Sequence, residues 1–223
     1  MPQQIPSLGT VGEEASGLRR QQQVKVFLGY VHPGMVHSSF MQSVLKLLHE
    51  PTHTVLVAGN GSGPLICRAR NELLEAFLAS DAEAFLSVDT DISFDPGTLD
   101  QLVGVDQPIV GAHYKGVNSA GTFPVALLKS NATGLYDKAT YKALRGRKGL
   151  KKVDAVGMGF TLIRREVVEA LGVGVLWPFA EILSEQGQAL GEDATFCLRA
   201  KEKGFDAHLL LDARVGHHKT TQY

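Results

Sequence analysis

The sequence has few cysteines, no long apolar run and almost no net charge. Its two cysteines, Cys67 and Cys197, cannot form a disulfide framework or a multi-cysteine zinc site, and isolated cysteines are usually small, buried apolar side chains. The 22 Lys and Arg residues nearly balance the 23 Asp and Glu residues, giving a formal net charge of -1. Such a chain has no overall field that would attract nucleic acid or an anionic membrane, so we expect no strong binding to either.

The chain also lacks the segments that direct proteins into or across membranes. No apolar stretch approaches the roughly 20 residues that span a bilayer, and the first 23 residues have no apolar core of a secretion signal. We therefore expect a cytoplasmic protein. Residues 1–23 also show neither helical nor strand periodicity, which predicts a flexible N-terminal arm.

What the sequence does have is the composition of a globular protein: 44% of its 223 residues are hydrophobic and 20% are charged. That length suits one large domain that buries roughly 70% of its unfolded surface. The 24 glycines exceed the typical ~7% share, which indicates many tight turns and close backbone approaches. We expect a single domain over residues 24–223, with its function carried by loops.

Apolar stretches rich in β-branched residues alternate with stretches of helical periodicity. The predicted strands are residues 24–31, 54–58, 84–88, 108–112 and 205–211, and the predicted helices are residues 38–48, 64–79, 95–103, 164–171 and 191–204. Residues Gly59 to Pro64, which follow the predicted strand 54–58, are predicted to form a glycine-rich loop. This order predicts an α/β fold with a mostly parallel, doubly wound sheet.

A basic segment interrupts this regular order. Between residues 138 and 152 there are seven basic side chains and no acidic one: Lys138, Lys142, Arg145, Arg147, Lys148, Lys151 and Lys152. Two interpretations stay open at this point. The segment is either a solvated face, as most charge runs are, or a lid that closes over a diphosphate or receives an acidic acceptor.

An acidic pair, Asp89 and Asp91, follows a fully apolar predicted strand. Ligands of open α/β sheets bind beyond the carboxyl ends of the strands, so the pair stands where a site is expected. Two carboxylates one residue apart can both face a divalent cation, which retains water and substrate phosphates as further ligands. On spacing alone, however, such a pair more often caps a helix or forms an Asx turn.

Eight segments in one fixed order decide between these interpretations. Together they resemble the GT-A type nucleotide-sugar glycosyltransferases, especially the small family 2-like enzymes of bacteriophages, over about residues 24–219. The segments are VKVFLGY, ICRARNELL, FLSVDTDISFDP, PIVGAHY, VGMGFTLIRREVVEAL, WPF, GEDATFCLRAKEKGF and LDARVGHHK. The resemblance implies a single-domain GT-A fold, which is Rossmann-like, with a mostly parallel central sheet flanked by helices.

The resemblance implies a metal site at Asp89, Asp91 and His217. In such enzymes the second carboxylate of the Asp-x-Asp motif binds manganese or magnesium on the nucleotide diphosphate, and the first lies near the ribose or the metal. The family's C-terminal His falls on His217, but the adjacent His218 leaves that assignment ambiguous by one residue. Imidazole ligation favours Mn²⁺ over Mg²⁺, and the cation would neutralise the diphosphate leaving group.

The resemblance also implies a catalytic acidic pair at Glu192 and Asp193, on the acceptor side. In inverting members one carboxylate deprotonates the attacking hydroxyl, and we assign that role to Asp193. The alternative is plain capping, because carboxylates are favoured at a helix N-terminus.

Further positions match those that hold the donor in the family. Arg70 and Asn71 match residues that contact the base or phosphates of the nucleotide, and an Arg fork suits diphosphate geometry. Gly157 and Gly159 match the segment that lines the donor sugar pocket, and Trp177 is placed to stack on a sugar ring. The alternatives are a surface arginine on a helix for Arg70 and ordinary core packing for the 157–160 segment.

We therefore expect a metal-dependent glycosyltransferase that moves a sugar from a nucleoside diphosphate sugar, most often UDP-linked in such enzymes, to a hydroxyl acceptor. The phage resemblance suggests a virion protein, modified DNA or a small molecule as acceptor. A sugar-phosphate nucleotidyltransferase is the first alternative, but it normally has a basic, glycine-rich loop after the first strand, where residues 30–35 contain no Lys or Arg. The second is a noncatalytic carbohydrate- or partner-binding module on the same fold.

Overall fold

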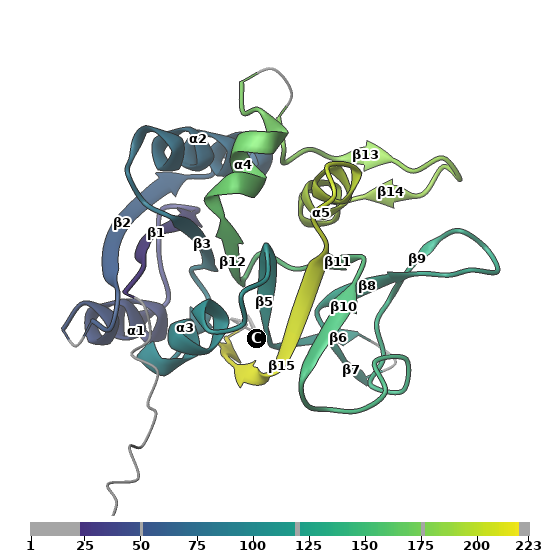
Figure 1. Cartoon of the computed structure of the whole chain (residues 1–223), viewed down its shortest axis with the longest axis horizontal. Coiled ribbons are helices and arrows are strands. Elements are labelled where there is room, and N and C mark those ends of the chain that lie inside the picture. The colour runs from purple at the N-terminus through teal and green to yellow at the C-terminus, as the bar shows by residue number, and fades with distance from the viewer. Residues whose placement is uncertain (1–22, 50, 119–120, 175–176, 219–223) are drawn as a thin grey trace, which may run out of the picture.

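The computed structural model describes residues 23–49, 51–118, 121–174 and 177–218. It has three layers, with helices on both faces of a central sheet (Figure 1). The helices are α1 (Ser38–His49), α2 (Ile66–Ala79), α3 (Pro96–Val103), α4 (Arg165–Leu171) and α5 (Glu192–Glu202). The strands are β1 (Lys25–His32), β2 (Thr54–Gly61), β3 (Ala84–Asp89), β4 (Ile92–Ser93), β5 (Ile109–His113), β6 (Lys115–Asn118), β7 (Gly121–Pro124), β8 (Ala126–Lys129), β9 (Tyr136–Lys138), β10 (Leu150–Val153), β11 (Ala155–Val156), β12 (Phe160–Arg164), β13 (Ile182–Leu183), β14 (Ala189–Leu190), β15 (Ala207–Arg214) and β16 (Gly216–His217).

The main sheet has seven strands in the order β10-β15-β5-β12-β3-β1-β2. Strands β2, β1 and β3 are parallel to one another, β5 is parallel to β15, and β12 is antiparallel to both β3 and β5. β10 is antiparallel to β15. Five of the seven strands therefore run in one direction, which confirms the predicted α/β fold with a mostly parallel sheet.

Strict alternation of strand and helix does not hold in the second half of the chain. After β5, strands β6 to β9 and β11 form small antiparallel pairs outside the main sheet, and β10 joins the main sheet beside β15. The chain then reaches the carboxyl edge of β3, where Asp89 N–H donates to Gly159 O at 3.0 Å. A strand that starts at that edge has to run back across the sheet, so β12 is antiparallel to its neighbours.

Two predicted loop boundaries differ from the structure. β2 continues to Gly61 because its last residues still pair with β1, so the predicted loop from Gly59 to Pro64 is shorter, and α2 begins at Ile66. The basic segment is not one continuous lid either. Its two ends are β-structure, and β10 is an edge strand of the main sheet.

Both faces of the sheet are covered by helices. In β1, Phe27 packs into the cluster beneath α2, α4 and α5, whereas its neighbour Leu28 packs into the cluster beneath α1 and α3. In β3, Phe85 and Leu86 divide between the same two clusters. Successive side chains of a strand point to opposite faces, so a strand covered on both sides is mostly apolar, as β3 is from Ala84 to Val88 apart from Ser87.

One edge of the sheet collects the ends of several elements. The carboxyl end of β3 leads to Asp91, β16 pairs with β4 just beyond it, and the N-terminus of α5 reaches the same place through Asp193, whose carboxylate accepts Met158 N–H at 3.0 Å. Of the predicted arm, only Gln23 is among the described residues, so the domain boundary stays a prediction. No helix in the described ranges is long and apolar enough to cross a membrane.

Gly29 in β1 lies against the ring of Phe85, which is 2% exposed. A Cβ at Gly29 would be 2.5 Å from Phe85 Cε2. We expect Gly29→Ala to lower the free energy of unfolding by about 1–3 kcal/mol, because the buried ring has to leave its position. Urea denaturation measures this. The matched control is Gly61→Ala, whose added Cβ would meet no atom within 4 Å; equal losses in both variants would contradict the packing argument.

Candidate active site

The pair of Asp91 and His217 lies at the carboxyl edge of the sheet. Asp91 Oδ2 and His217 Nε2 are 3.1 Å apart. His217 Nδ1 is 3.3 Å from the carbonyl oxygen of Lys115, which can only accept a hydrogen bond. A proton on Nδ1 would be donated to that carbonyl, and Nε2 would then face the carboxylate oxygen with its lone pair. Two such electron-rich atoms are stable at this distance only with a proton or a cation between them.

This separation fits two ligands of one metal ion. Ligands at about 2.1 Å on adjacent corners of an octahedron are themselves about 3 Å apart. In the described ranges no group of three or more His, Cys, Asp or Glu side chains could hold a metal by itself. Asp91 and His217 therefore fit a cation that takes its remaining ligands from water and a bound diphosphate, and not a closed protein cage.

His218 is engaged elsewhere. Its backbone N–H donates to Asp91 O at 2.8 Å, and its Nε2 lies 2.7 Å from Ser93 Oγ. Its ring stacks on that of His37, with centroids 4.7 Å apart and an interplanar angle of 17°. Of the two adjacent histidines, the geometry thus favours His217 as the metal ligand, while His218 holds the turn that carries Asp91.

Arg70 of α2 is a buried cation among three carboxylates. It is 5% exposed, and Nη2 donates to Asp89 Oδ1 at 3.1 Å. Nε lies 3.8 Å from Glu192 Oε1, and Nη1 lies 3.7 Å from Asp193 Oδ1. The alternative of a surface arginine is therefore wrong. Arg70 reaches the Asp-x-Asp motif and the acidic pair together.

These carboxylates also fix the charge of Arg70. Burial by itself lowers the pKa of the guanidinium. The negative charges of Asp193, Asp89 and Glu192 more than offset burial and hold the pKa above its ordinary value. Arg70 is thus a permanent positive charge within the cluster.

Asp193 begins α5 with its carboxylate turned into the cluster. Oδ2 accepts Met158 N–H at 3.0 Å, whereas the buried Oδ1 has no hydrogen-bond partner in the described part of the chain. Burial raises the pKa of Asp193 to about 6; Arg70 works against this rise, and Asp89 adds to it. This oxygen lies 3.7 Å from Arg70 Nη1, so it faces a positive charge without a hydrogen bond of normal length.

Tyr114, directly after β5, was not predicted as a site residue. Its hydroxyl oxygen accepts Gly159 N–H at 3.1 Å, and its ring meets the His217 ring edge-on at 5.5 Å between centroids. Burial raises the pKa of Tyr114 well above its ordinary value, and Asp89 and Asp193 reinforce the shift. The phenol is therefore neutral, with its proton free to donate. Its only sequence signal was its place at the end of an apolar strand.

Gly159 gives Tyr114 and Asp89 room. A Cβ at Gly159 would lie 2.7 Å from the Tyr114 hydroxyl and 3.2 Å from Asp89 Oδ2. Gly157 lies against the same tyrosine hydroxyl, and its carbonyl accepts Thr161 Oγ1–H at 2.8 Å. The segment predicted to line the donor pocket thus borders the carboxylate cluster.

Asn71 and Trp177 stand apart from this cluster. Asn71 is 1% exposed, and its amide donates to Cys67 O and Phe179 O and accepts Phe179 N–H, at 2.7, 2.8 and 3.1 Å. These bonds fasten the loop around Phe179 to α2. Trp177, 46% exposed, lines a hollow of about 310 Å³ whose other lining residues belong to α2 or precede it. Asn71 is used in hydrogen bonds within the protein and Trp177 lies beside α2, so their contacts with a donor stay predictions.

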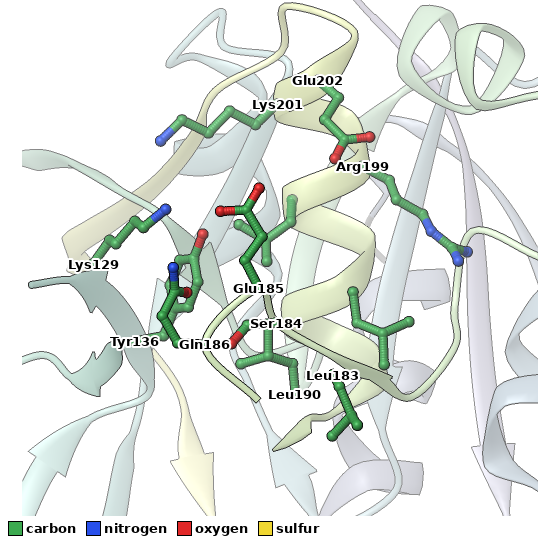
Figure 2. Close-up of a pocket in the computed structure, with 12 residues that line it drawn as sticks. Lys129, Tyr136, Leu183, Ser184, Glu185, Gln186, Leu190, Arg199, Lys201 and Glu202 are labelled. Atoms are coloured by element: carbon green, nitrogen blue, oxygen red, sulfur yellow. The ribbon is translucent and has the colours of Figure 1, made fainter. Parts of the chain in front are cut away.

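A larger hollow of about 510 Å³ lies elsewhere, beside the second half of α5 and the β13–β14 hairpin. Figure 2 shows Lys129, Lys201 and Glu185 gathered around it, with Leu183 and Leu190 below. None of the predicted site residues lines it. Its size alone does not make it the site, because the perturbed and unpartnered groups lie at the carboxyl edge of the sheet.

No protein-family model and no curated protein matches the sequence. Among solved structures, A197 from STIV is similar with a TM-score of 0.54 and 14% identity, over 88% of this chain and 95% of that one. A crystal structure of GalNAc-T7 with UDP, GalNAc and Mn²⁺ is similar with a TM-score of 0.61 and 12% identity, over 91% of this chain. This chain spans 45% of the length of that one.

At these identities the likeness concerns the fold. The chain has the α/β fold of the GT-A glycosyltransferases.

Proposed function

We propose that the protein is a metal-dependent glycosyltransferase that moves a sugar, most simply a hexose, from a nucleoside diphosphate sugar to a hydroxyl acceptor. The observation that carries the proposal is the 3.1 Å pair of Asp91 and His217, set beside the Arg70 cluster at the carboxyl edge of a GT-A sheet. The UDP and Mn²⁺ named for GalNAc-T7 support a UDP-sugar and manganese. The resemblance to family 2-like phage enzymes supports the same reaction class.

Asp91 and His217 would hold the cation, and the imidazole favours Mn²⁺ over Mg²⁺. When bound, the cation supplies Lewis-acid neutralisation of the diphosphate leaving group. Asp89 is held by Arg70 at 3.1 Å. Its second oxygen, Oδ2, lies toward Gly159. We therefore propose that Asp89 contacts the donor nucleotide and is not a main ligand of the metal.

Asp193 is the proposed base of an inverting transfer. The acceptor oxygen forms a bond to the anomeric carbon, the bond from that carbon to the diphosphate oxygen breaks, and its electron pair leaves with the nucleoside diphosphate. The acceptor proton moves to Asp193, whose pKa of about 6 suits a base that works near neutral pH. Burial raises the pKa of Asp193, the positive charge of Arg70 lowers it, and the negative charge of Glu192 raises it.

We first expect release of UDP from a UDP-sugar in the presence of Mn²⁺, measured as donor hydrolysis across a panel of UDP-sugars. Asp91→Asn should reduce it by about 10²–10³-fold, the usual size of losing one electrostatic stabiliser. The matched control is Asp137→Asn, an exposed aspartate of β9. Full turnover in Asp91→Asn would overturn the metal assignment, and UDP·Mn²⁺ binding without any hydrolysis or transfer would favour the noncatalytic module.

Adjacent histidines allow a sharp test of the metal ligand. Thermal unfolding with UDP and Mn²⁺ should show about 2.7 kcal/mol of stabilisation at 100 times the dissociation constant. His217→Ala should weaken this Mn²⁺-dependent binding by more than about tenfold, since changes outside the ligand set already cost 10–100-fold. His218→Phe keeps a ring to stack on His37 and should retain more of the binding. The reverse ranking would move the ligand to His218.

The raised pKa of Asp193 predicts the pH dependence of transfer. The base works only when it is deprotonated, so kcat/KM should rise as the pH passes upward through about 6. Asp193→Asn should lower kcat by about 10²–10⁴-fold. Initial rates between about pH 5 and 8 measure both, with UDP·Mn²⁺ binding as the check on folding. If the Asp193→Asn enzyme is still active and its kcat/KM still rises through about pH 6, Asp193 is not the base.

A further inference from the structure

Three basic side chains from separate parts of the chain surround His113 at the end of β5. Lys115 begins β6, Arg147 lies in the turn between β9 and β10, and Arg214 ends β15. All three are exposed, whereas His113 is only 8% exposed. We call Lys115, Arg147 and Arg214 the cation triad.

Packing and strand register hold the triad in place. Arg214 is opposite His113 in the β15–β5 register, and Lys115 follows His113 by two residues. The Arg147 guanidinium lies 4.2 Å from the centroid of the Tyr141 ring, and Tyr141 Oη is 2.8 Å from His113 Nε2. The strand register therefore places Lys115 and Arg214 beside His113, and the Tyr141 ring holds Arg147 near the same histidine, while Arg214 also borders a hollow beside α1.

Acidic side chains do not balance the triad. In the described ranges no carboxylate lies within the 4.0 Å ion-pair distance of any of its three members. The nearby Asp212 accepts Gly149 N–H at 2.6 Å. Burial lowers the pKa of His113, and the three cations lower it further, so the imidazole stays neutral and adds no charge of its own. Like charges held together without counter-ions create a local positive potential that attracts anions.

The triad adjoins the proposed active site. The Lys115 carbonyl oxygen is 3.3 Å from His217 Nδ1. Tyr114, the residue before Lys115, accepts the N–H of Gly159, which borders the carboxylate cluster. That cluster has three carboxylates and a single guanidinium, that of Arg70, so it repels a second anion. A phosphate-bearing ligand that enters from this side would turn its phosphate toward the triad and its hydroxyl toward Asp193.

We propose that Lys115, Arg147 and Arg214 bind a phosphate group of the acceptor. Arginine forks suit phosphate oxygens, and a set of exposed cations implies strong dependence on salt. The assignment of this phosphate to the acceptor rests on the proposed function, whereas the binding of phosphate itself does not. A phosphorylated sugar and a nucleic-acid strand both offer this chemistry, and they are distinguished by experiment.

The test measures binding by calorimetry, without metal, of glucose 6-phosphate and of a short single-stranded DNA oligonucleotide. Arg147→Glu should weaken binding of at least one probe by about tenfold or more, which corresponds to 1.4 kcal/mol. Arg147→Lys keeps the charge and should retain most of the affinity. Lys203→Glu, at an exposed position after α5, is the matched charge-reversal control and should bind like the unsubstituted chain. The probe that binds more tightly identifies the source of the phosphate.

Two results would overturn the proposal: neither probe binds, or Lys203→Glu weakens binding as much as Arg147→Glu. Binding of UDP·Mn²⁺ is measured in parallel on the same proteins. If Arg147→Glu weakens it as much as it weakens the phosphate probes, the triad belongs to the donor and the acceptor assignment is wrong. If the unsubstituted chain binds a phosphate probe but never UDP·Mn²⁺, the proposed function fails while the anion site stands.

Discussion

The contact between Arg70 and three carboxylates is the constraint on which the rest of the site depends. Asp89 belongs to β3, Glu192 and Asp193 belong to α5, and Arg70 belongs to α2, so one guanidinium fixes three elements that are distant in the chain. Arg70 is the buried member of this group, and leaving a buried charge without its counter-charge typically costs about 3–5 kcal/mol. The arrangement is therefore a packing requirement of the fold as well as a feature of the site.

The backbone around this contact is shaped to leave the acids accessible. Because β12 starts at the edge where β3 ends, the Gly157–Gly159 segment passes directly beside Asp89. Only a residue without a side chain fits at Gly159, since Tyr114 Oη and Asp89 Oδ2 occupy the space that a Cβ would need. The segment before β12 thus donates Met158 N–H to Asp193 and Gly159 N–H to the Tyr114 hydroxyl, beside the same carboxylates.

Local patterns predicted much of this structure. The apolar run before Asp89, the start of α5 at Glu192 and the helix α3 follow from periodicity and from residues that favour helix ends, and these depend on neighbours in the chain. Long-range contacts could not be predicted in this way. The polar atoms of Asn71 are taken by a loop 108 residues away, and the burial of Arg70 depends on a helix that begins far along the sequence. Tyr114 was missed because nothing local distinguishes a tyrosine beside the carboxylate cluster from a core one.

Net charge was informative about the whole chain and uninformative about its parts. A value of -1 hides two neighbouring regions of opposite sign: a carboxylate cluster with a single arginine, and the cation triad, which forms no ion pair among the described residues. In the proposed function the first region takes the divalent cation and the second takes the phosphate, which requires that neither region neutralise the other. Their separation is set by the strand order, which places β5 and β15 on one side of β12 and β3 on the other. The sheet topology therefore determines which charged part of a substrate can face which side of the site.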